Sequence, residues 1–286
     1  MQTAKNLINK SARFIAATAQ APRQSVPFIQ MKDDDSAEVF VYDVIGGFMG
    51  EPTVDLVRSI SEIEASTITV RVNSPGGGVF DGIAIYNALK KHDAKVIVQI
   101  DGIAASIASV IALAGDEVNM LLGTQFMIHK PLMFGGGNAD DFEKLIDVLN
   151  GAEDSIVSIY KTKTGLSDSE IRSALKAETW YSPEEALEAG FVDSIVEAEK
   201  AENTFDLSAI FENVPEGLRR EPTVREVEQA LRATGMSRRR AGTAAVAAMN
   251  TQVEGRDVRD DDPGEPDLLA SIERLKEIYK PNKGGI

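Results

Sequence analysis

A serine and a histidine in this sequence are placed where they could act together as a nucleophile and its general base. Ser106 follows Asp101-Gly102-Ile103-Ala104-Ala105, where an apolar strand gives way to a helix of small residues. A serine at such a strand-to-helix turn can be exposed at the end of a sheet, as in a nucleophile elbow. In the alternative interpretation, Ser106 and Ser109 only cap a close-packed helix or bond back to its backbone.

The sequence contains two histidines, and their surroundings differ. His129 follows Phe126-Met127-Ile128 and precedes a Gly-rich loop, which is where a catalytic base at the edge of a sheet would lie. His92 lies in Lys90-Lys91-His92-Asp93, a polar helix end where a solvated role is the simpler interpretation. A lone histidine after a strand is more often structural, but His129 is the better candidate partner for Ser106.

A glycine-rich turn supplies a third candidate feature. Asn73-Ser74-Pro75-Gly76-Gly77-Gly78 follows one apolar strand and precedes a helix. Glycines let backbone N–H groups approach a ligand, and a helix start favours negative charge, so the turn suits a phosphate or a developing oxyanion. It lacks the Gly-Lys-Ser/Thr of a nucleotide P-loop and the spacing of a dinucleotide fingerprint. The alternative is an ordinary tight βα turn.

The serine, the histidine and the glycine-rich turn lie within a sequence of alternating strand and helix patterns. Strands are predicted at residues 38–43, 67–72, 95–100, 117–120 and 126–129, and helices at residues 53–64, 79–91, 105–113 and 140–160. Ser167 to Glu170 and Ser182 to Glu185 each match a capping box that opens a further helix. Repeated strand-then-helix order predicts mainly parallel strands with crossover helices, so the fold class is α/β.

Composition excludes several classes of protein. The chain has 286 residues, 43% of them hydrophobic, which is enough to bury a core. It has no cysteine and two histidines, so disulfides, thiolate chemistry and a zinc site are not expected, and we predict no metal and no cofactor. A net charge of −15 argues against general nucleic-acid binding, and no apolar run reaches the ~18 residues of a membrane span. We expect a cytoplasmic location.

The two ends of the chain differ from its middle. Residues 1–32 contain five basic residues and no acid, and residues 257–267 are too acidic and too rich in Pro and Gly to pack. We therefore predict three parts: a basic N-terminal arm over residues 1–36, a catalytic domain over 37–197, and a C-terminal extension over 198–286 with short helices and an acidic linker.

Taken together, the motifs resemble the Clp protease proteolytic subunit (ClpP), a serine peptidase with a crotonase-like fold. The matching strings occur in the family's order: Asn73-Ser74-Pro75-Gly76-Gly77, Ile85-Tyr86-Asn87-Ala88-Leu89, Gly102-Ile103-Ala104-Ala105-Ser106, Met127-Ile128-His129-Lys130-Pro131, and Ser182-Pro183-Glu184-Glu185-Ala186 leading to Gly190-Phe191-Val192-Asp193. The resemblance implies a ClpP/crotonase-like superhelix of repeated β-β-α units with mainly parallel strands, to which flexible N- and C-terminal extensions are attached.

The resemblance also implies a role for each site residue. Ser106 would be the nucleophile, His129 the general base, and the backbone N–H groups of Gly77 and Ile107 the oxyanion hole. The family's third catalytic residue is an Asp four residues before the Ser of the capping-box segment. Here that position is Glu178, a departure that leaves Asp168 as a fallback acid.

The long extensions make the chain similar to the ClpP-like head maturation (prohead) proteases of tailed bacteriophages. That similarity implies homo-oligomeric rings, with the helix over residues 140–160 as the ring-to-ring contact, and capsid and scaffold proteins as substrates cut inside the prohead without an ATPase. The alternative is the proteolytic subunit of an ATP-dependent Clp-type protease. A crotonase-fold acyl-CoA enzyme and a catalytically silent assembly protein are minor alternatives.

Overall fold

The computed structural model describes residues 29–33, 35–46, 53–133, 135–197 and 207–219, together with five isolated positions between 225 and 242. The chain divides into two compact units, Met1–Pro215 and Glu216–Ile286. The strands are β1 (Ile29–Met31), β2 (Ser36–Tyr42), β3 (Thr67–Ser74), β4 (Lys95–Ala105), β5 (Glu117–Leu121), β6 (Gln125–Ile128), β7 (Thr179–Tyr181) and β8 (Ser194–Val196). The helices are α2 (Thr53–Ser61), α3 (Val79–Lys90), α4 (Ile107–Ala112), α5 (Ala139–Thr164), α6 (Asp168–Ala177), α7 (Pro183–Glu188), α8 (Leu207–Ile210) and the 3-10 helix η1 (Glu216–Leu218).

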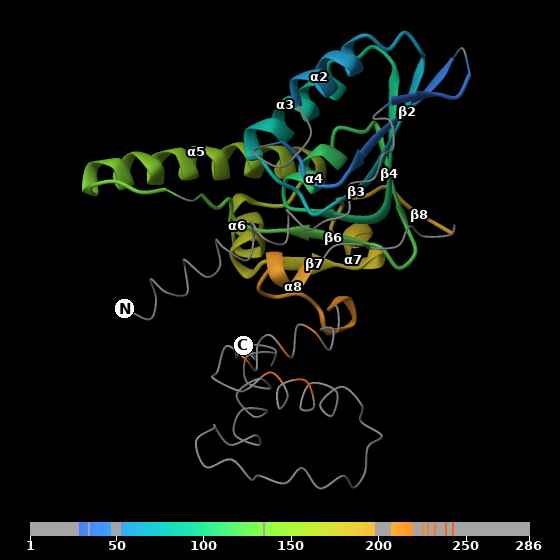
Figure 1. The fold of residues 1–286 in the computed structure, drawn as a ribbon. Helices are drawn as coiled ribbons and strands as arrows, with labels where there is room; N and C mark the ends of the chain where they lie inside the picture. The colour runs from blue at the N-terminus through green and yellow to red at the C-terminus, as the bar shows by residue number, and fades with distance from the viewer. Residues whose placement is uncertain are drawn as a thin grey trace, which may run out of the picture. The chain divides into compact units, whose positions relative to one another are not determined.

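The sheet is mainly parallel, as the strand-then-helix order predicts. Its order is β1-β2-β3-β4-β5-β8, with β6 paired to β4 and β7 paired to β6. The β2–β3, β3–β4, β4–β5, β4–β6 and β5–β8 pairs are parallel, whereas β1–β2 and β6–β7 are antiparallel. Figure 1 shows α2, α3 and α4 packed along the strands and β6 and β7 forming a second layer with α6 and α7. The predicted α/β class is confirmed.

Strand β4 is long because it joins the two parts of the sheet. Its first half pairs with β5 through Ile97–Ile100, and its second half pairs with β6 through Ile103–Ala105. Between the halves the register against β3 shifts, since Val72 lies opposite Ile100 whereas Ser74 lies opposite Ala104. The prediction ended this strand at Ile100; the strand continues because the bulge redirects it toward a new partner.

Side-chain hydrogen bonds stabilise the irregular segment in the middle of β4. The amide N–H of Ile103 donates to the Asn73 side-chain oxygen at 3.2 Å. The buried Asp101 carboxylate accepts from Arg71 Nε at 2.7 Å and from an Arg71 terminal nitrogen at 2.8 Å. It also accepts from the Tyr42 hydroxyl at 2.7 Å and the Gln99 amide at 2.9 Å. The buried charge is therefore fully partnered, as a charge inside a sheet requires.

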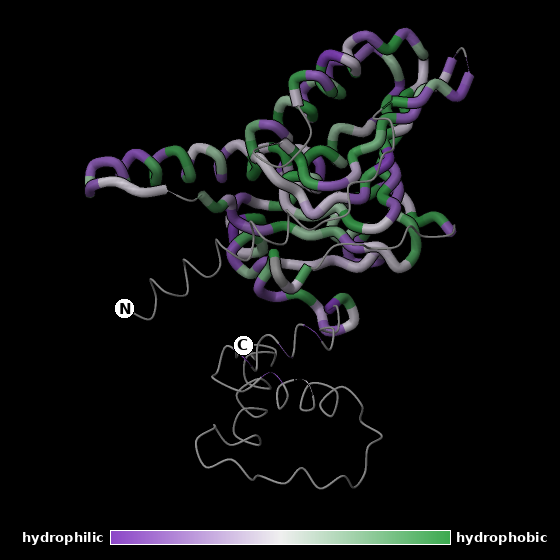
Figure 2. The backbone as a smooth tube through the Cα atoms, viewed as in Figure 1, coloured by the Kyte–Doolittle hydropathy of each residue, from purple (hydrophilic) through white to green (hydrophobic). Residues whose placement is uncertain are grey.

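The core lies between the sheet and helices α2 to α5. On β2, β3 and the first half of β4, alternate residues are buried, whereas α4 is buried at every position from Ile107 to Ala112. In Figure 2 the hydrophobic colour follows the strands and the sheet-facing sides of the helices. A half-buried sheet gives the alternation, and a helix enclosed on all sides gives the continuous apolar run.

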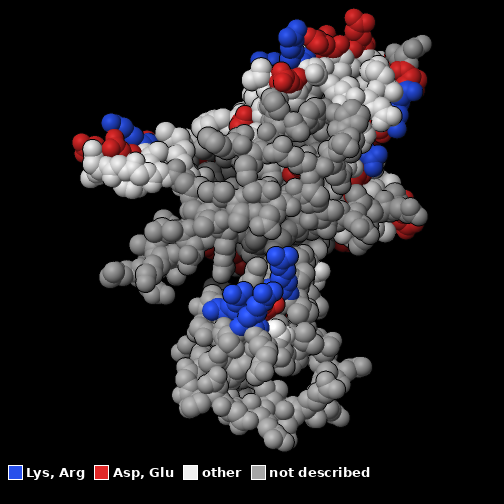
Figure 3. Space-filling view, viewed as in Figure 1, with Lys and Arg blue, Asp and Glu red and all other residues white. Residues whose placement is uncertain are grey.

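The helices begin where their capping residues predict. Ser167 with Glu170 and Ser182 with Glu185 both form complete capping boxes, which confirms the two predicted helix starts. Helix α5 projects from the body, as Figure 1 shows, and residues 139–151 include no buried position. Acidic and basic side chains lie together at its projecting end in Figure 3, where Asp141 and Lys144 approach to 4.0 Å.

The described residues extend beyond the predicted catalytic domain at both ends. Ile29–Met31 pairs with β2 as an edge strand, although it precedes residue 37. After residue 206, Leu207, Ile210, Phe211 and Val214 are buried in the first compact unit. The predicted basic arm before residue 29 and the acidic linker over 257–267 lie outside the described residues. In the described part of the chain, no helix has the length and apolar character needed to cross a membrane.

Candidate active site

Ser106 and His129 are brought together by two parallel strands that end side by side. Ser106 directly follows β4 and His129 directly follows β6, and Ala105 lies opposite Met127 in the register between them. Parallel strands deliver the residues after their carboxyl ends to the same edge of a sheet. Ser106 Oγ lies 2.8 Å from His129 Nε2, which is hydrogen-bonding distance. This distance places a base next to the hydroxyl from which it would take the proton.

The backbone at Ser106 has the strained geometry of a nucleophile elbow. Its φ is 55° and its ψ is −127°, a conformation that a residue with a Cβ rarely adopts. The turn is held from both sides, because the Ser106 N–H donates to Met127 O at 2.9 Å and the Ser109 hydroxyl donates to Ser106 O at 2.5 Å. Strain maintained by fixed neighbours exposes the Ser106 hydroxyl at the strand end.

Tyr160 of α5 completes the support beneath this elbow. Its hydroxyl lies 2.7 Å from Ser109 Oγ, and since the Ser109 proton is directed at Ser106 O, Tyr160 is the donor of this bond. Burial raises the pKa of Tyr160, so the phenol remains protonated and keeps that role across the physiological range. Ser109 therefore supports the nucleophile's backbone and is not itself a second nucleophile.

The glycine turn after β3 lies against the elbow. Gly76 has a φ of +95°, and a Cβ there would lie 2.7 Å from both Ala105 O and Ser106 Cβ. Gly77 has a φ of +154°, and a Cβ there would lie 2.1 Å from Ile45 O. Ile107 is the first residue of α4, where a helix leaves its N–H without a carbonyl partner in the preceding turn. A Cβ at Gly76 would also lie 3.2 Å from the Ile107 nitrogen, so the glycine turn approaches both Ser106 and the first N–H of α4.

Glu178 lies between α6 and β7, the strand that pairs with β6. The antiparallel register runs from Phe126 opposite Tyr181 to Ile128 opposite Thr179, and so ends one residue before His129 on one strand and one residue after Glu178 on the other. Glu178 is the C-cap residue that follows α6, with a left-handed φ of 53°. The fallback acid Asp168 lies at the other end of α6, exposed, and is bound at 2.7 Å by Lys161. That ion pair lowers the pKa of Asp168.

The loop that follows His129 is anchored to α5 and α6. The Lys130 N–H donates to Leu175 O at 3.1 Å, and its ammonium lies 3.0 Å from Glu153. Glu153 is buried and also accepts from Arg172 at 2.9 Å. A carboxylate shared by two cations in this way fixes the exit of β6, and so holds the His129 backbone in place.

A small cavity opens beside the hydroxyl and the imidazole. It has a volume of about 10 Å³ and is lined by Ser106, His129 and six further residues: Val79, Ile107, Val110, Pro131, Ile156 and Tyr160. Space for about one water molecule next to a serine and a histidine would admit a small group or a hydrolytic water. In the part of the chain that the structure describes, no group of three or more His, Asp or Glu is arranged to hold a metal.

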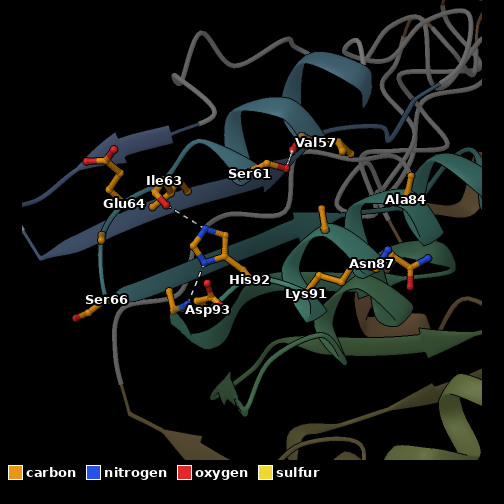
Figure 4. Close-up of a pocket in the computed structure, with 13 residues that line it drawn as sticks. Val57, Ser61, Ile63, Glu64, Ser66, Ala84, Asn87, Lys91, His92 and Asp93 are labelled. Carbon is orange, nitrogen blue, oxygen red and sulfur yellow. Dashed lines mark hydrogen bonds between the residues drawn. The ribbon is translucent and has the colours of Figure 1, made fainter.

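The second histidine belongs to a larger cavity that shares no lining residue with the first. This cavity, of about 850 Å³, lies between the ends of α2 and α3, and Figure 4 shows His92 within it. The Ala94 N–H donates to His92 Nδ1 at 3.0 Å, so Nε2 carries the proton and donates to Ile63 O at 3.1 Å. The sequence predicted a solvated His92, but its ring joins two loops, and neither nitrogen is directed at a hydroxyl.

Comparison with known proteins identifies the family. The family model described as Clp protease matches residues 34–199, which is more than half of the chain. The chain belongs to the Clp protease family. It is accordingly a serine-type peptidase, and the predicted ClpP-like family and enzyme class are confirmed. The phage subgroup and the roles of individual site residues remain predictions.

Several relatives carry the same family name. The chain is 28% identical to ATP-dependent Clp protease proteolytic subunit 1 of Protochlamydia amoebophila, over 59% of this chain and 85% of the relative. It is 34% identical to the proteolytic subunit of Bdellovibrio bacteriovorus, over 47% of this chain and 66% of the relative. It is 28% identical to chloroplastic subunit 3 of Arabidopsis thaliana, over 68% of this chain and 66% of the relative.

Sequence reasoning missed one segment near the histidine. Phe211, which lies beyond the family match, places its ring 5.5 Å from the ring of His129 at an interplanar angle of 87°. The signal that could have found it is the spacing of Leu207, Ile210, Phe211 and Val214, which repeats at three, four and seven residues.

Proposed function

We propose that the chain is a serine endopeptidase in which Ser106 is the nucleophile and His129 the general base. The observation that carries the proposal is the 2.8 Å contact between Ser106 Oγ and His129 Nε2 at the end of two adjacent parallel strands. The strained φ of Ser106 supports the same assignment, because strain of this kind is retained where a side chain must be presented to a ligand.

The proposed reaction uses these groups in the following roles. His129 takes the proton of Ser106 as Oγ attacks the peptide carbonyl, and the N–H groups of Gly77 and Ile107 receive the oxyanion. Each such donor is worth ~3–4 kcal/mol in the transition state. His129 then protonates the leaving amine, and a water activated by the same imidazole hydrolyses the acyl-enzyme. Glu178, which directly precedes the strand paired with β6, would orient the imidazole.

Labelling with a fluorophosphonate probe tests this assignment. The wild type is expected to gain one adduct by intact mass without ATP or a partner, and Ser106→Ala none. His129→Ala should label about 10²–10⁴-fold more slowly, since general base catalysis is lost. Ser109→Ala removes a support of the Ser106 backbone but keeps the Ser106 hydroxyl, so this variant should still gain the adduct. An adduct that persists in Ser106→Ala would overturn the assignment.

For the biological role, we propose cleavage of capsid and scaffold proteins during phage head maturation, without an ATPase. The long segments on either side of the family match support this, because residues 1–33 and 200–286 fall outside it. A basic arm and an acidic tail suit co-assembly with a charged scaffold.

A second role is the proteolytic subunit of an ATP-dependent Clp-type protease. The names of the relatives favour it, since those proteins are described as ATP-dependent Clp subunits. Two assays on the same preparation separate the roles. Cleavage of capsid or scaffold protein without ATP would support the maturation role. Degradation of a folded protein only with ATP and an unfoldase would support the second.

Either role is compatible with homo-oligomeric rings, which we propose on the basis of α5. The projecting half of this helix carries Phe142, Ile146 and Val148, exposed by 47%, 54% and 42%. Exposed apolar side chains on a projecting helix mark an association surface. Native mass spectrometry of the wild type and of Phe142→Glu/Ile146→Glu would show whether the larger assembly divides when this surface becomes charged.

A further inference from the structure

A short segment after the family match packs beside the proposed catalytic partners. Leu207, Ile210, Phe211 and Val214 are all buried, at 0%, 6%, 5% and 2% exposure. Leu207 and Ile210 lie in α8, and Phe211 and Val214 lie in the segment that follows it. Helix α8 has only four residues and cannot be stable by itself, so its contacts with the domain must hold it in place.

Phe211 connects this segment to the histidine strand. Its ring lies 5.5 Å from that of His129 and also 5.5 Å from that of Trp180, nearly perpendicular to each. Trp180 is in β7, opposite Met127 of the strand that leads to His129. Perpendicular aromatic contacts of this kind are attractive and directional. Phe211 therefore restrains the imidazole and the strand beside it together.

Asn213 connects the same segment to the proposed third catalytic residue. Its backbone N–H donates to Glu178 Oε1 at 2.5 Å, and its side-chain amide donates to Ala177 O at 3.0 Å. Ala177 is the last residue of α6, where helical carbonyls lack intrahelical partners. One residue thus caps the helix and binds the carboxylate that follows it, at a position whose backbone is left-handed.

We propose that residues 207–214 form a clamp that positions both partners of the nucleophile, with Phe211 acting on His129 and Asn213 on Glu178. This inference rests on the proposed function of Ser106, His129 and Glu178. Phe211 and Asn213 are positioning residues: they act through the imidazole and the carboxylate. Since the family match ends at residue 199, the clamp is a feature of this chain's extension.

The contact can be tested without measuring catalysis. The chain has two histidines, so ¹³Cε1-labelled histidine gives two NMR signals, and the His129→Ala variant assigns them. Phe211→Ala should shift the His129 signal, because an aromatic ring at this distance is removed, and should leave the His92 signal as an internal reference. An unchanged His129 signal would overturn the clamp.

Activity of the full chain then tests positioning. Phe211→Ala and Asn213→Pro should each lower kcat on a peptide substrate by about tenfold with little change in KM, because misplacing a catalytic group by a fraction of an ångström costs rate more than binding. Proline is chosen at position 213 because it lacks the backbone N–H that Glu178 accepts, whereas Asn213→Ala keeps this N–H and removes only the side-chain bond to Ala177. Phe211→Leu should recover part of the loss. Ser208→Ala, an exposed change in the same segment, should match the wild type.

A double variant separates positioning from general damage. In a His129→Ala background, Phe211→Ala should cause no further loss of fluorophosphonate labelling, since a residue that acts through His129 has nothing left to position. A second tenfold loss would overturn the clamp. If wild-type labelling does not depend on His129, the proposed function itself fails. If labelling depends on His129 and Phe211→Ala equals the wild type, only the clamp fails.

Discussion

Glu178 is the residue at which this chain departs from the family's Asp, and its position can be tested against Asp168. Glu178 directly precedes β7, which pairs with the strand that leads to His129, whereas Asp168 is exposed and bound by Lys161. We expect Glu178→Gln to lower kcat by about 10²-fold or more, because a neutral amide cannot stabilise the imidazolium. Asp168→Asn should leave kcat unchanged. Steady-state kinetics of both variants decide the question, and the reverse pattern would assign the role to Asp168.

The Asp101 network predicts a large stability effect at a single residue. Asp101 is buried, with four hydrogen bonds from Arg71, Tyr42 and Gln99. Asp101→Ala should lower the free energy of unfolding by about 3–5 kcal/mol, since it removes the nearest partner of the Arg71 guanidinium and leaves it only the longer 3.6 Å contact with Glu38.

A matched control for this effect is the exposed pair of Lys95 and Glu117. Glu117→Ala should lower the free energy of unfolding far less than Asp101→Ala, because water and salt screen an exposed ion pair. Urea unfolding monitored by circular dichroism measures both variants. Equal losses in the two would refute the assignment of Asp101 as a structural anchor.

At the residue level, the sequence indicated that Ser106 and His129 belong together, and the structure brings them to 2.8 Å, but it did not indicate the residues around them. Both lie in motifs at strand ends, so their types and neighbours were sufficient to select them. Asn213 and Phe211 are distant in sequence from the residues they contact, and nothing in their local sequence indicates a partner. His92 was misjudged for the same reason, because its hydrogen bonds go to the backbone of another loop.

The packing of α3 on α4 links a glycine to the proposed oxyanion donor. A Cβ at Gly82 would lie 2.2 Å from a side-chain carbon of Ile107. Gly82→Ala should therefore displace Ile107, slow fluorophosphonate labelling by about tenfold, and destabilise the domain by about 1–3 kcal/mol through overpacking.

Gly151 provides the contrasting change within a helix. It lies in α5, and no atom stands within 4 Å of the position a Cβ would take. Gly151→Ala should stabilise the protein by about 0.5–1 kcal/mol, because alanine loses less backbone entropy in a helix. Thermal unfolding should show a lower melting temperature than the wild type for Gly82→Ala and a higher one for Gly151→Ala. Fluorophosphonate labelling should slow only in Gly82→Ala. A parallel response would show that the close approach of Gly82 to Ile107 has no consequence.

Element types were predictable where periodicity was long, and element ends where caps were present. The α5 prediction of residues 140–160 lies within the observed Ala139–Thr164, because an amphipathic pattern persists over several turns. The three-residue strands β1, β7 and β8 were not predicted, since so short a segment shows no alternation and depends on pairing with a distant strand. The extension of β4 beyond Ile100 was missed because a bulge breaks the pattern.

At the scale of the whole molecule, the limits of the catalytic unit lead to a truncation experiment. The sequence placed the end of this unit at residue 197, whereas the compact unit runs to Pro215 and includes the buried Leu207 and Val214. A chain ending at Pro215 should fold and take up the fluorophosphonate label at the full-length rate.

A chain ending at Glu197 loses four buried apolar side chains and both clamp contacts. Burying one such side chain contributes about 1.5–3 kcal/mol, so this chain should melt well below the Pro215 chain. It should also label at least about tenfold more slowly, because His129 and Glu178 lose the groups that hold them. Equal melting temperatures and labelling rates for the two truncated chains would support residue 197 as the end of the catalytic domain. A deficit confined to the shorter chain would show that this peptidase needs part of its extension to complete the active site.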